Sequence, residues 1–132
     1  MLHMLDTDMA SFIIRERSPN IREKLVALLP SMLCISVMTR AELLYGLRKL
    51  PPEHRLNIAV RRFFKIIRTL PWESDAADFY ADIRHRLVST GQIIGEMDMM
   101  IAAHSMAIGA VLVTNNLKHY ERIPGLSLVN WT

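Results

Sequence analysis

The sequence predicts an α/β domain with a central, mainly parallel sheet, and two features of the chain lead to this prediction. Short apolar runs recur along the 132 residues. They alternate with longer segments of helical periodicity, which is the pattern of consecutive βα units. A chain of this length can bury one ordinary hydrophobic core but offers little room for two. We therefore expect a single domain over residues 1–132.

Each expected strand is a short apolar run bounded by polar residues. Runs of this kind are typical of parallel strands that are buried on both faces of the sheet. The first begins at the N-terminus and stops at Asp6. The other four cover residues 32–37, 66–70, 110–113 and 126–129.

The expected helices carry apolar residues at three- and four-residue spacing and are bounded by glycine or proline. Thr39 and Ser74 are expected to start two of them, because threonine and serine favour the N-cap position. The predicted helices cover residues 12–17, 21–29, a segment from 39 through 47, a segment that ends near 65, 74–90 and 96–108.

The charge balance favours a polyanionic partner. The chain carries 16 Lys and Arg against 13 Asp and Glu, with a net charge of +3 and a pI of about 9.4, so nucleic acid is a suitable partner class. Two basic clusters suit phosphate contacts, although a solvated helix face explains each of them equally well. They are Arg61, Arg62, Lys65 and Arg68, and the pair Arg84 and Arg86 around His85.

Composition also limits the cellular setting. No apolar run approaches the roughly 18 residues of a membrane span, and the N-terminus lacks the pattern of a signal peptide. The single cysteine, Cys34, lies in an apolar segment and cannot form an internal disulfide. We expect a buried, inert thiol in a protein of the cytoplasm that has no membrane partner.

The first candidate for chemistry is Asp6, which ends the first expected strand. In open α/β sheets, ligands bind just beyond the carboxyl ends of the strands, and Asp6, Thr7 and Asp8 lie there. A simpler interpretation also fits: a turn followed by the N-cap of the next helix, where Asp and Thr are favoured. Local sequence leaves both interpretations open.

Three further polar residues follow expected strands or open expected helices: Glu42, Asp98 and Asn116. Glu42 comes three residues after Thr39, so a capping box explains it better than catalysis on local grounds. Asp98 lies in a first helical turn among methionines, where a carboxylate buried nearly all round would need a paired cation or metal. Asn116 alone is ordinary turn chemistry after a strand.

Together, Asp6, Glu42, Asp98 and Asn116 would converge on one edge of a parallel sheet. Hard oxygen ligands in this number are typical of a Mg²⁺ or Mn²⁺ site. The five histidines do not share a spacing typical of metal ligands, and His104 is expected to lie in the core. The nine methionines are likewise expected to fill the core.

These residues lie in stretches that resemble the PIN-domain ribonucleases, and within them the VapC-type toxins of bacterial toxin-antitoxin pairs. The matching stretches occur in the family's order and spread over essentially the whole chain. They are MLDT at 4–7, TRAELLYG at 39–46, DMMIAAH at 98–104, LVTNN at 112–116, YERIPGL at 120–126 and VNW at 129–131.

The resemblance implies a three-layer α/β/α fold and a metal-dependent endoribonuclease. Carried over by position, it implies that Asp6 and Asp98 hold Mg²⁺, or alternatively Mn²⁺, and that Glu42 belongs to the catalytic site. Asn116 stands where many relatives have a fourth acid. Relatives cleave structured RNA, and the enteric branch that this chain resembles cuts initiator tRNA in its anticodon loop.

The resemblance also implies partners and two departures from the family pattern. It implies a cognate VapB-type antitoxin that inhibits the enzyme, and a homodimer within a larger assembly that binds promoter DNA through the antitoxin. Asp8 stands where asparagine is expected, so its charge would either tighten metal binding or repel the scissile phosphate. Glu96 takes a position often held by proline.

Other functions compete with this interpretation. The spacing of Asp6 and Asp8 also suits a Mg²⁺-dependent, haloacid-dehalogenase-like phosphatase with a D-x-D motif, although Ala10 stands where that family places Thr or Val. A receiver domain would need a phosphorylatable Asp after residues 66–70, and Pro71 follows instead. A non-enzymatic alternative is a binding module whose acidic cleft receives an arginine of a partner.

Overall fold

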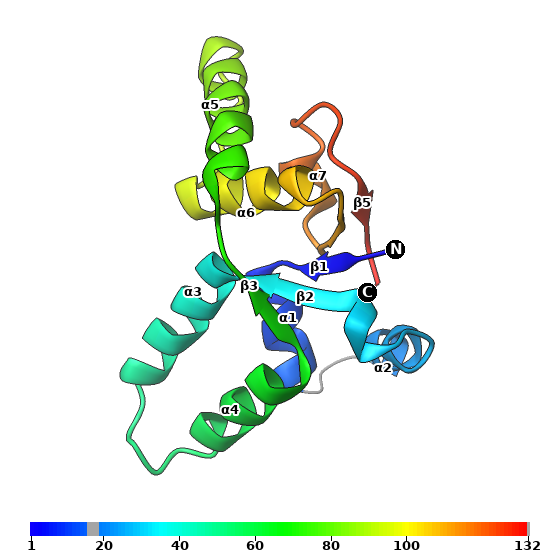
Figure 1. Ribbon diagram of the computed structural model, residues 1–132. Helices are drawn as coiled ribbons and strands as arrows, with labels where there is room; N and C mark the ends of the chain where they lie inside the picture. Colours follow the sequence, from blue (N-terminus) through cyan, green and yellow to red (C-terminus); the bar gives the residue numbers. More distant parts are fainter. Residues whose placement is uncertain (16–18, 132) are drawn as a thin grey trace.

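The centre of the molecule is a five-stranded sheet with the order β3-β2-β1-β4-β5, in which all neighbouring strands run parallel (Figure 1). The computed structural model describes residues 1–15 and 19–131. The predicted class, α/β with a mainly parallel sheet, is confirmed. The strands are β1 (His3–Leu5), β2 (Leu33–Ser36), β3 (Arg68–Leu70), β4 (Val111–Val113) and β5 (Leu128–Val129).

Helices connect most of the strands, as the alternating pattern predicts. No helix in the described part of the chain is long and apolar enough to cross a membrane. The helices are α1 (Thr7–Ile14), α2 (Pro19–Val26), the 3₁₀ helix η1 (Pro30–Met32), α3 (Val37–Arg48), α4 (Leu56–Ile66), α5 (Ser74–Ser89), α6 (Glu96–Ala107) and α7 (Leu117–Tyr120).

Both faces of the sheet are covered by helices. Successive side chains of a strand point to opposite faces, and the central strands are apolar at successive positions, so both faces must be buried. Met4 and Leu112 pack into one core with residues of α5 and α6. Leu5 and Val113, their neighbours in the same strands, pack into a second core with residues of α1, α2 and α4. The fold therefore has the three α/β/α layers that the resemblance implied.

The position of β1 explains why the site forms where it does. β1 is the middle strand, with β2 and β3 on one side and β4 and β5 on the other. Met4 is paired with Cys34 in β2 and with Leu112 in β4. A reversal of strand order of this kind creates the crevice in which open α/β sheets bind ligands. Asp6 follows β1 directly and so lies at the crevice.

Several boundaries differ from the predicted ones. The second predicted helix ends at Val26 because η1 begins only four residues later. The third strand begins at Arg68, since the Ile67 amide still donates to the Phe63 carbonyl of α4 (2.9 Å). The four-residue helix α7 was not expected, and residues 16–18 of the first predicted helix lie outside the described residues.

The start of α3 corrects a prediction that bears on the site. Ser36, not Thr39, is the N-cap, and its hydroxyl accepts a hydrogen bond from the Met38 amide (3.1 Å). Thr39 lies buried inside the first turn. Glu42 is therefore too far along the helix to form a capping box, and that interpretation is wrong. The other expected start, Ser74, is the first residue of α5 rather than its cap.

We expect Ser36→Ala to lower the free energy of unfolding by about 2–3 kcal/mol, from the lost cap and from a buried partner left without its bond. That partner is His104, a core histidine as predicted, whose Nδ1 lies 2.8 Å from the Ser36 hydroxyl. Urea denaturation measures the change. Ser31→Ala, at an exposed serine, should change stability by less than about 0.5 kcal/mol. Equal losses in the two variants would contradict this account.

Candidate active site

The four residues predicted for the site, Asp6, Glu42, Asp98 and Asn116, line one pocket at the carboxyl ends of the central strands. They come from four places in the fold: the end of β1, α3, the first turn of α6 and the residue before α7. The pocket has a volume of about 180 Å³. Its remaining lining residues are Thr7, Asp8 and Tyr120.

Asp6 is the buried carboxylate of the pocket, with only 4% of its surface exposed. Its Oδ1 accepts a hydrogen bond from the Met9 amide (2.8 Å), so it is the N-cap of α1. Burial raises its pKa from 3.8 to about 6, against the opposing effect of a hydrogen bond from Thr114. The N-cap interpretation is confirmed, and Asp6 also lines the pocket, so the cap does not exclude a role in ligand binding.

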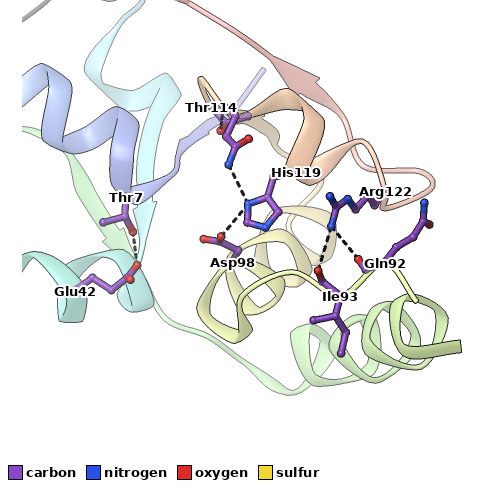
Figure 2. Close-up of polar contacts among 9 residues, drawn as sticks. Thr7, Glu42, Gln92, Ile93, Asp98, Thr114, His119 and Arg122 are labelled. Atoms are coloured by element: carbon purple, nitrogen blue, oxygen red, sulfur yellow. Dashed lines mark hydrogen bonds and ion pairs between the residues drawn. The ribbon is translucent and has the colours of Figure 1, made fainter. Parts of the chain in front are cut away.

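Glu42 is held in the pocket by the start of α1. The Thr7 hydroxyl donates to Glu42 Oε1 at 2.5 Å (Figure 2). It also lies 3.1 Å from the Thr39 hydroxyl. This support from Thr7 and Thr39 was not predicted from the sequence. The bond fixes Glu42 relative to Asp6, since Thr7 is the next residue in the chain.

Asp98 is more accessible than its sequence neighbours suggest. Its side chain is 35% exposed, so the prediction of a carboxylate buried nearly all round is wrong. The first turn of α6 forms a wall of the open pocket, and the buried side chains of this helix begin at Met99. The buried Tyr120 forms a hydrogen bond with Asp98, and the pKa of Tyr120 is raised by burial and by the nearby carboxylates.

His119 of α7 is a further polar residue at this site. Its Nδ1 lies 3.4 Å from Asp98 Oδ2 (Figure 2). The same nitrogen lies 3.0 Å from Asn116 Nδ2. The spacing of the five histidines in the sequence does not indicate this position. The available signal was its position three residues after Asn116, which is a spacing that brings two side chains together on one helical turn.

The pocket concentrates negative charge. Within residues 1–15 and 19–131, no Lys or Arg forms an ion pair with Asp6, Asp8, Glu42 or Asp98, and His119 is their only basic partner. Asp8 and Asp98 each contribute to the raised pKa of Asp6. Clustered carboxylates of this kind are unfavourable unless a cation compensates them.

The donor set suits a hard divalent cation, because carboxylate and amide oxygens are its preferred ligands. In the described part of the chain, no three His, Cys, Asp or Glu side chains already lie close enough together to hold a metal by themselves. Mg²⁺ does not need three, since it is commonly held by one or two carboxylates while water and substrate phosphate complete its shell. The pocket therefore fits such an ion.

The two basic clusters do not line this pocket. Arg61, Arg62 and Lys65 are exposed on α4. Arg68 donates to the Ser31 carbonyl (3.1 Å), and Arg84 pairs with Glu96 (3.0 Å). The ion pair partly neutralises the α5 cluster, which weakens its interpretation as a phosphate contact.

Comparison with known proteins identifies the family. Residues 4–126 match the family model described as PIN domain. The chain is 40% identical to the tRNA(fMet)-specific endonuclease VapC of Salmonella typhimurium over 129 residues, 97% of this chain and 96% of the relative. It is 34% identical to the enzyme of the same name from Shigella flexneri, over 98% and 97% of the two chains.

Solved structures agree with the sequence relatives. The DNA-bound VapBC of Salmonella typhimurium superposes with a TM-score of 0.93 at 38% identity over the full length of both chains. VapBC2 of Rickettsia felis, bound to a DNA fragment from its promoter, gives 0.92 at 31% identity, again over both full lengths. The chain belongs to the PIN-domain family. Within that family it belongs with the VapC ribonucleases. These relatives support the ribonuclease interpretation and not the D-x-D phosphatase.

Proposed function

We propose that this chain is the toxin of a type II toxin-antitoxin pair, a metal-dependent endoribonuclease that cleaves initiator tRNA in its anticodon loop. The observation that carries this proposal is the convergence of Asp6, Glu42, Asp98 and Asn116 on one pocket of a PIN-domain chain. The tRNA(fMet) specificity in the names of two relatives supports the substrate class. The protein would act in the cytoplasm as one PIN domain over residues 1–132.

PIN-domain nucleases generally depend on a divalent metal, and the proposal assigns Mg²⁺ to this pocket. Asp6 and Asp98 would hold the ion, because they are the carboxylates at the end of β1 and on the facing turn of α6. When bound, such an ion supplies an activated water and screens the charge that develops on a phosphodiester.

The chain's own residues supply the remaining functions. Glu42 is suited to accept the proton of the attacking water, and the Thr7 hydroxyl keeps its carboxylate pointed into the pocket. Asn116 contacts His119, which in turn contacts Asp98. Asn116 therefore offers an uncharged amide to a substrate phosphate close to the carboxylates. Asp8 is exposed at the mouth of the pocket, where its negative charge would favour a metal-loaded site over a free one.

The surface next to the pocket suits the antitoxin. A second hollow shares Thr7, Asp8 and Glu42 with the acidic pocket. A largely apolar groove of about 690 Å³ lies further along α1, between it and α2. We propose that a VapB-type antitoxin packs apolar residues in this groove and places an arginine among the carboxylates. VapBC complexes among the structural relatives, two of them bound to DNA, support an assembly that also binds promoter DNA.

The proposal is tested with purified protein, freed of antitoxin, incubated with total bacterial tRNA and Mg²⁺. Primer extension should show one discrete cut that EDTA abolishes. Asp98→Asn should slow it by more than about 100-fold, since even residues around metal ligands affect activity by 10–100-fold. Asp78→Asn, at an exposed acid of α5, should cleave normally.

Cleavage by Asp98→Asn at the wild-type rate would overturn the proposal. Hydrolysis of a generic phosphomonoester while tRNA stays whole would also overturn it. If wild-type protein binds antitoxin tightly but cuts no RNA, the acidic pocket is a binding site for the antitoxin and the enzymatic assignment fails.

A further inference from the structure

Tyr45 of α3 is an aromatic side chain that the fold leaves uncovered. Its exposed fraction is 64%. Among the Phe, Tyr and Trp residues of the ranges 1–15 and 19–131, it is the only exposed one. A single exposed apolar side chain is ordinary on a protein surface, so exposure alone assigns it no function. Its function depends on what lies around it.

Tyr45 lies on the face of α3 that forms a wall of the acidic pocket. α3 begins at the carboxyl end of β2 and runs away from the sheet (Figure 1). Side chains spaced by three or four positions share one face of a helix, and this spacing relates Met38, Glu42, Tyr45 and Lys49. Met38 packs against the core and Glu42 lines the pocket. Tyr45 therefore continues this wall outward, with its Cβ atom about 5–6 Å from that of Glu42.

The ring of Tyr45 already holds one cation. Lys49 Nζ lies 4.7 Å from the centroid of the ring, which is a cation–π contact. Because 64% of the side chain is exposed, the ring also keeps a face open to solvent. Lys49 and its exposed neighbour Arg48 form no ion pair within the described residues. An open aromatic face and two cations without an acidic partner thus stand beside the pocket.

This combination suits single-stranded RNA. Bases in RNA loops can be splayed out and stacked on aromatic rings, while basic side chains beside the ring hold the backbone phosphates. The antitoxin is a poorer occupant of this position. The segment proposed for it carries an arginine into the pocket, and Lys49 and Arg48 would repel that charge. Charge complementarity therefore favours RNA.

We propose that Tyr45 stacks on a base of the RNA loop next to the scissile phosphodiester, and that Lys49 binds a phosphate beside that base. This inference rests on the proposed ribonuclease function and deepens it, because it names how the substrate is held. Every base has a π face, so stacking tolerates any base. Tyr45 is thus a positioning residue that selects an unpaired strand rather than a particular sequence.

The test is single-turnover cleavage of the anticodon stem-loop of initiator tRNA in Mg²⁺, at increasing concentrations of antitoxin-free enzyme. In Tyr45→Ala, the half-saturating enzyme concentration should rise about 5–100-fold, the range for loss of one base–aromatic stack. The maximal rate should change by less than about threefold, since the pocket carboxylates are unchanged. Tyr45→Phe keeps the ring and should match the wild type. Tyr45→Leu is apolar without a π face and should match Tyr45→Ala.

A second measurement follows the base and the phosphate separately. 2-Aminopurine loses fluorescence when it stacks, so stem-loops with this base at single loop positions report the contact in stopped-flow mixing before cleavage. Wild type and Tyr45→Phe should quench one position that Tyr45→Ala does not. In Lys49→Gln, the logarithmic salt dependence of half-saturation should flatten by about 0.7, the value for one phosphate contact on a single strand. An unchanged slope would overturn the phosphate contact.

Ile58→Ala is the matched control, because it removes another exposed apolar side chain (61%) from α4 and should cleave like the wild type. Urea denaturation should give the same midpoint for all variants, since exposed positions tolerate such changes. The inference is overturned if Tyr45→Leu saturates like the wild type or if no loop position is quenched. It is also overturned if Tyr45→Ala weakens antitoxin binding and leaves RNA saturation unchanged. If the wild type cuts no RNA, the proposed function itself fails.

Discussion

Asp6→Asn is expected to abolish RNA cleavage and to make the metal-free protein more stable. Loss of one of the two carboxylates proposed to hold the ion should reduce the cleavage rate by more than about 100-fold. Even residues that only support metal ligands have effects of about 10–100-fold. Asparagine is as good an N-cap as aspartate, so the hydrogen bond from the Met9 amide to this side chain can be kept. The fold should therefore survive the change.

The gain in stability follows from the pKa of Asp6. Burial raises it from 3.8 to about 6, so between about pH 4 and pH 6 the folded state binds more protons than the unfolded chain. Stability then falls as pH rises through this window, and above it the folded protein carries the full cost of a buried charge. That cost amounts to about 3 kcal/mol for a shift of this size. Asp6→Asn removes it at neutral pH.

Urea denaturation in EDTA, at about pH 4 and at neutral pH, measures both parts of this prediction. Wild type and Asp6→Asn should differ little at the lower pH and most at neutral pH, with the variant more stable. Added Mg²⁺ should stabilise the wild type and leave the variant unchanged, because only a protein that binds the ion is stabilised by it. A variant less stable than wild type at neutral pH would contradict the assignment of Asp6 as a strained, buried anion.

The layers of the fold were predictable from sequence because each strand is a continuous apolar run. Leu5 and Met4 are adjacent and both fully buried, one in each core, and only a strand covered on both faces needs that pattern. Boundaries were harder to predict. Ser36 and Thr39 are both good caps by residue type, so local sequence does not choose between them. In the structure β2 ends at Ser36 and α3 begins at the next residue, so the position of the strand end decides which of the two is the cap.

The carboxylates of the candidate site were predictable from sequence, but the residues that hold these carboxylates in place were not. The ends of parallel strands bring Asp6 and the start of α3 together wherever the sheet forms. The exposure of Asp98 could not be predicted in this way. It depends on which side of α6 faces the pocket, and the neighbouring methionines do not indicate that side. His119 and Thr7 act through contacts with Asp98 and Glu42 from elsewhere in the chain. Such contacts become visible only after the fold is known.

Two substitutions of Tyr120 should distinguish its contribution to the hydrophobic core from its contribution to the pocket. Its ring lies in the core with Met4, Leu112 and Ile123 and is 1% exposed. Tyr120→Ala leaves a cavity, and we expect it to cost about 3–5 kcal/mol of unfolding free energy. This is a large share of the 5–15 kcal/mol typical of a domain, so the variant should be largely or partly unfolded at 37 °C.

Tyr120→Phe keeps the ring and removes only the hydroxyl that bonds Asp98. We expect a stability change of less than about 1.5 kcal/mol, the usual size of one net hydrogen bond. Mn²⁺ affinity and tRNA cleavage should nevertheless fall by about tenfold, because a metal ligand loses the partner that orients it. Unfolding curves, metal titration and cleavage rates of the three proteins measure these effects. If Tyr120→Phe cleaves and binds metal like the wild type, the hydroxyl does not position Asp98, and Tyr120 contributes only its ring to the core.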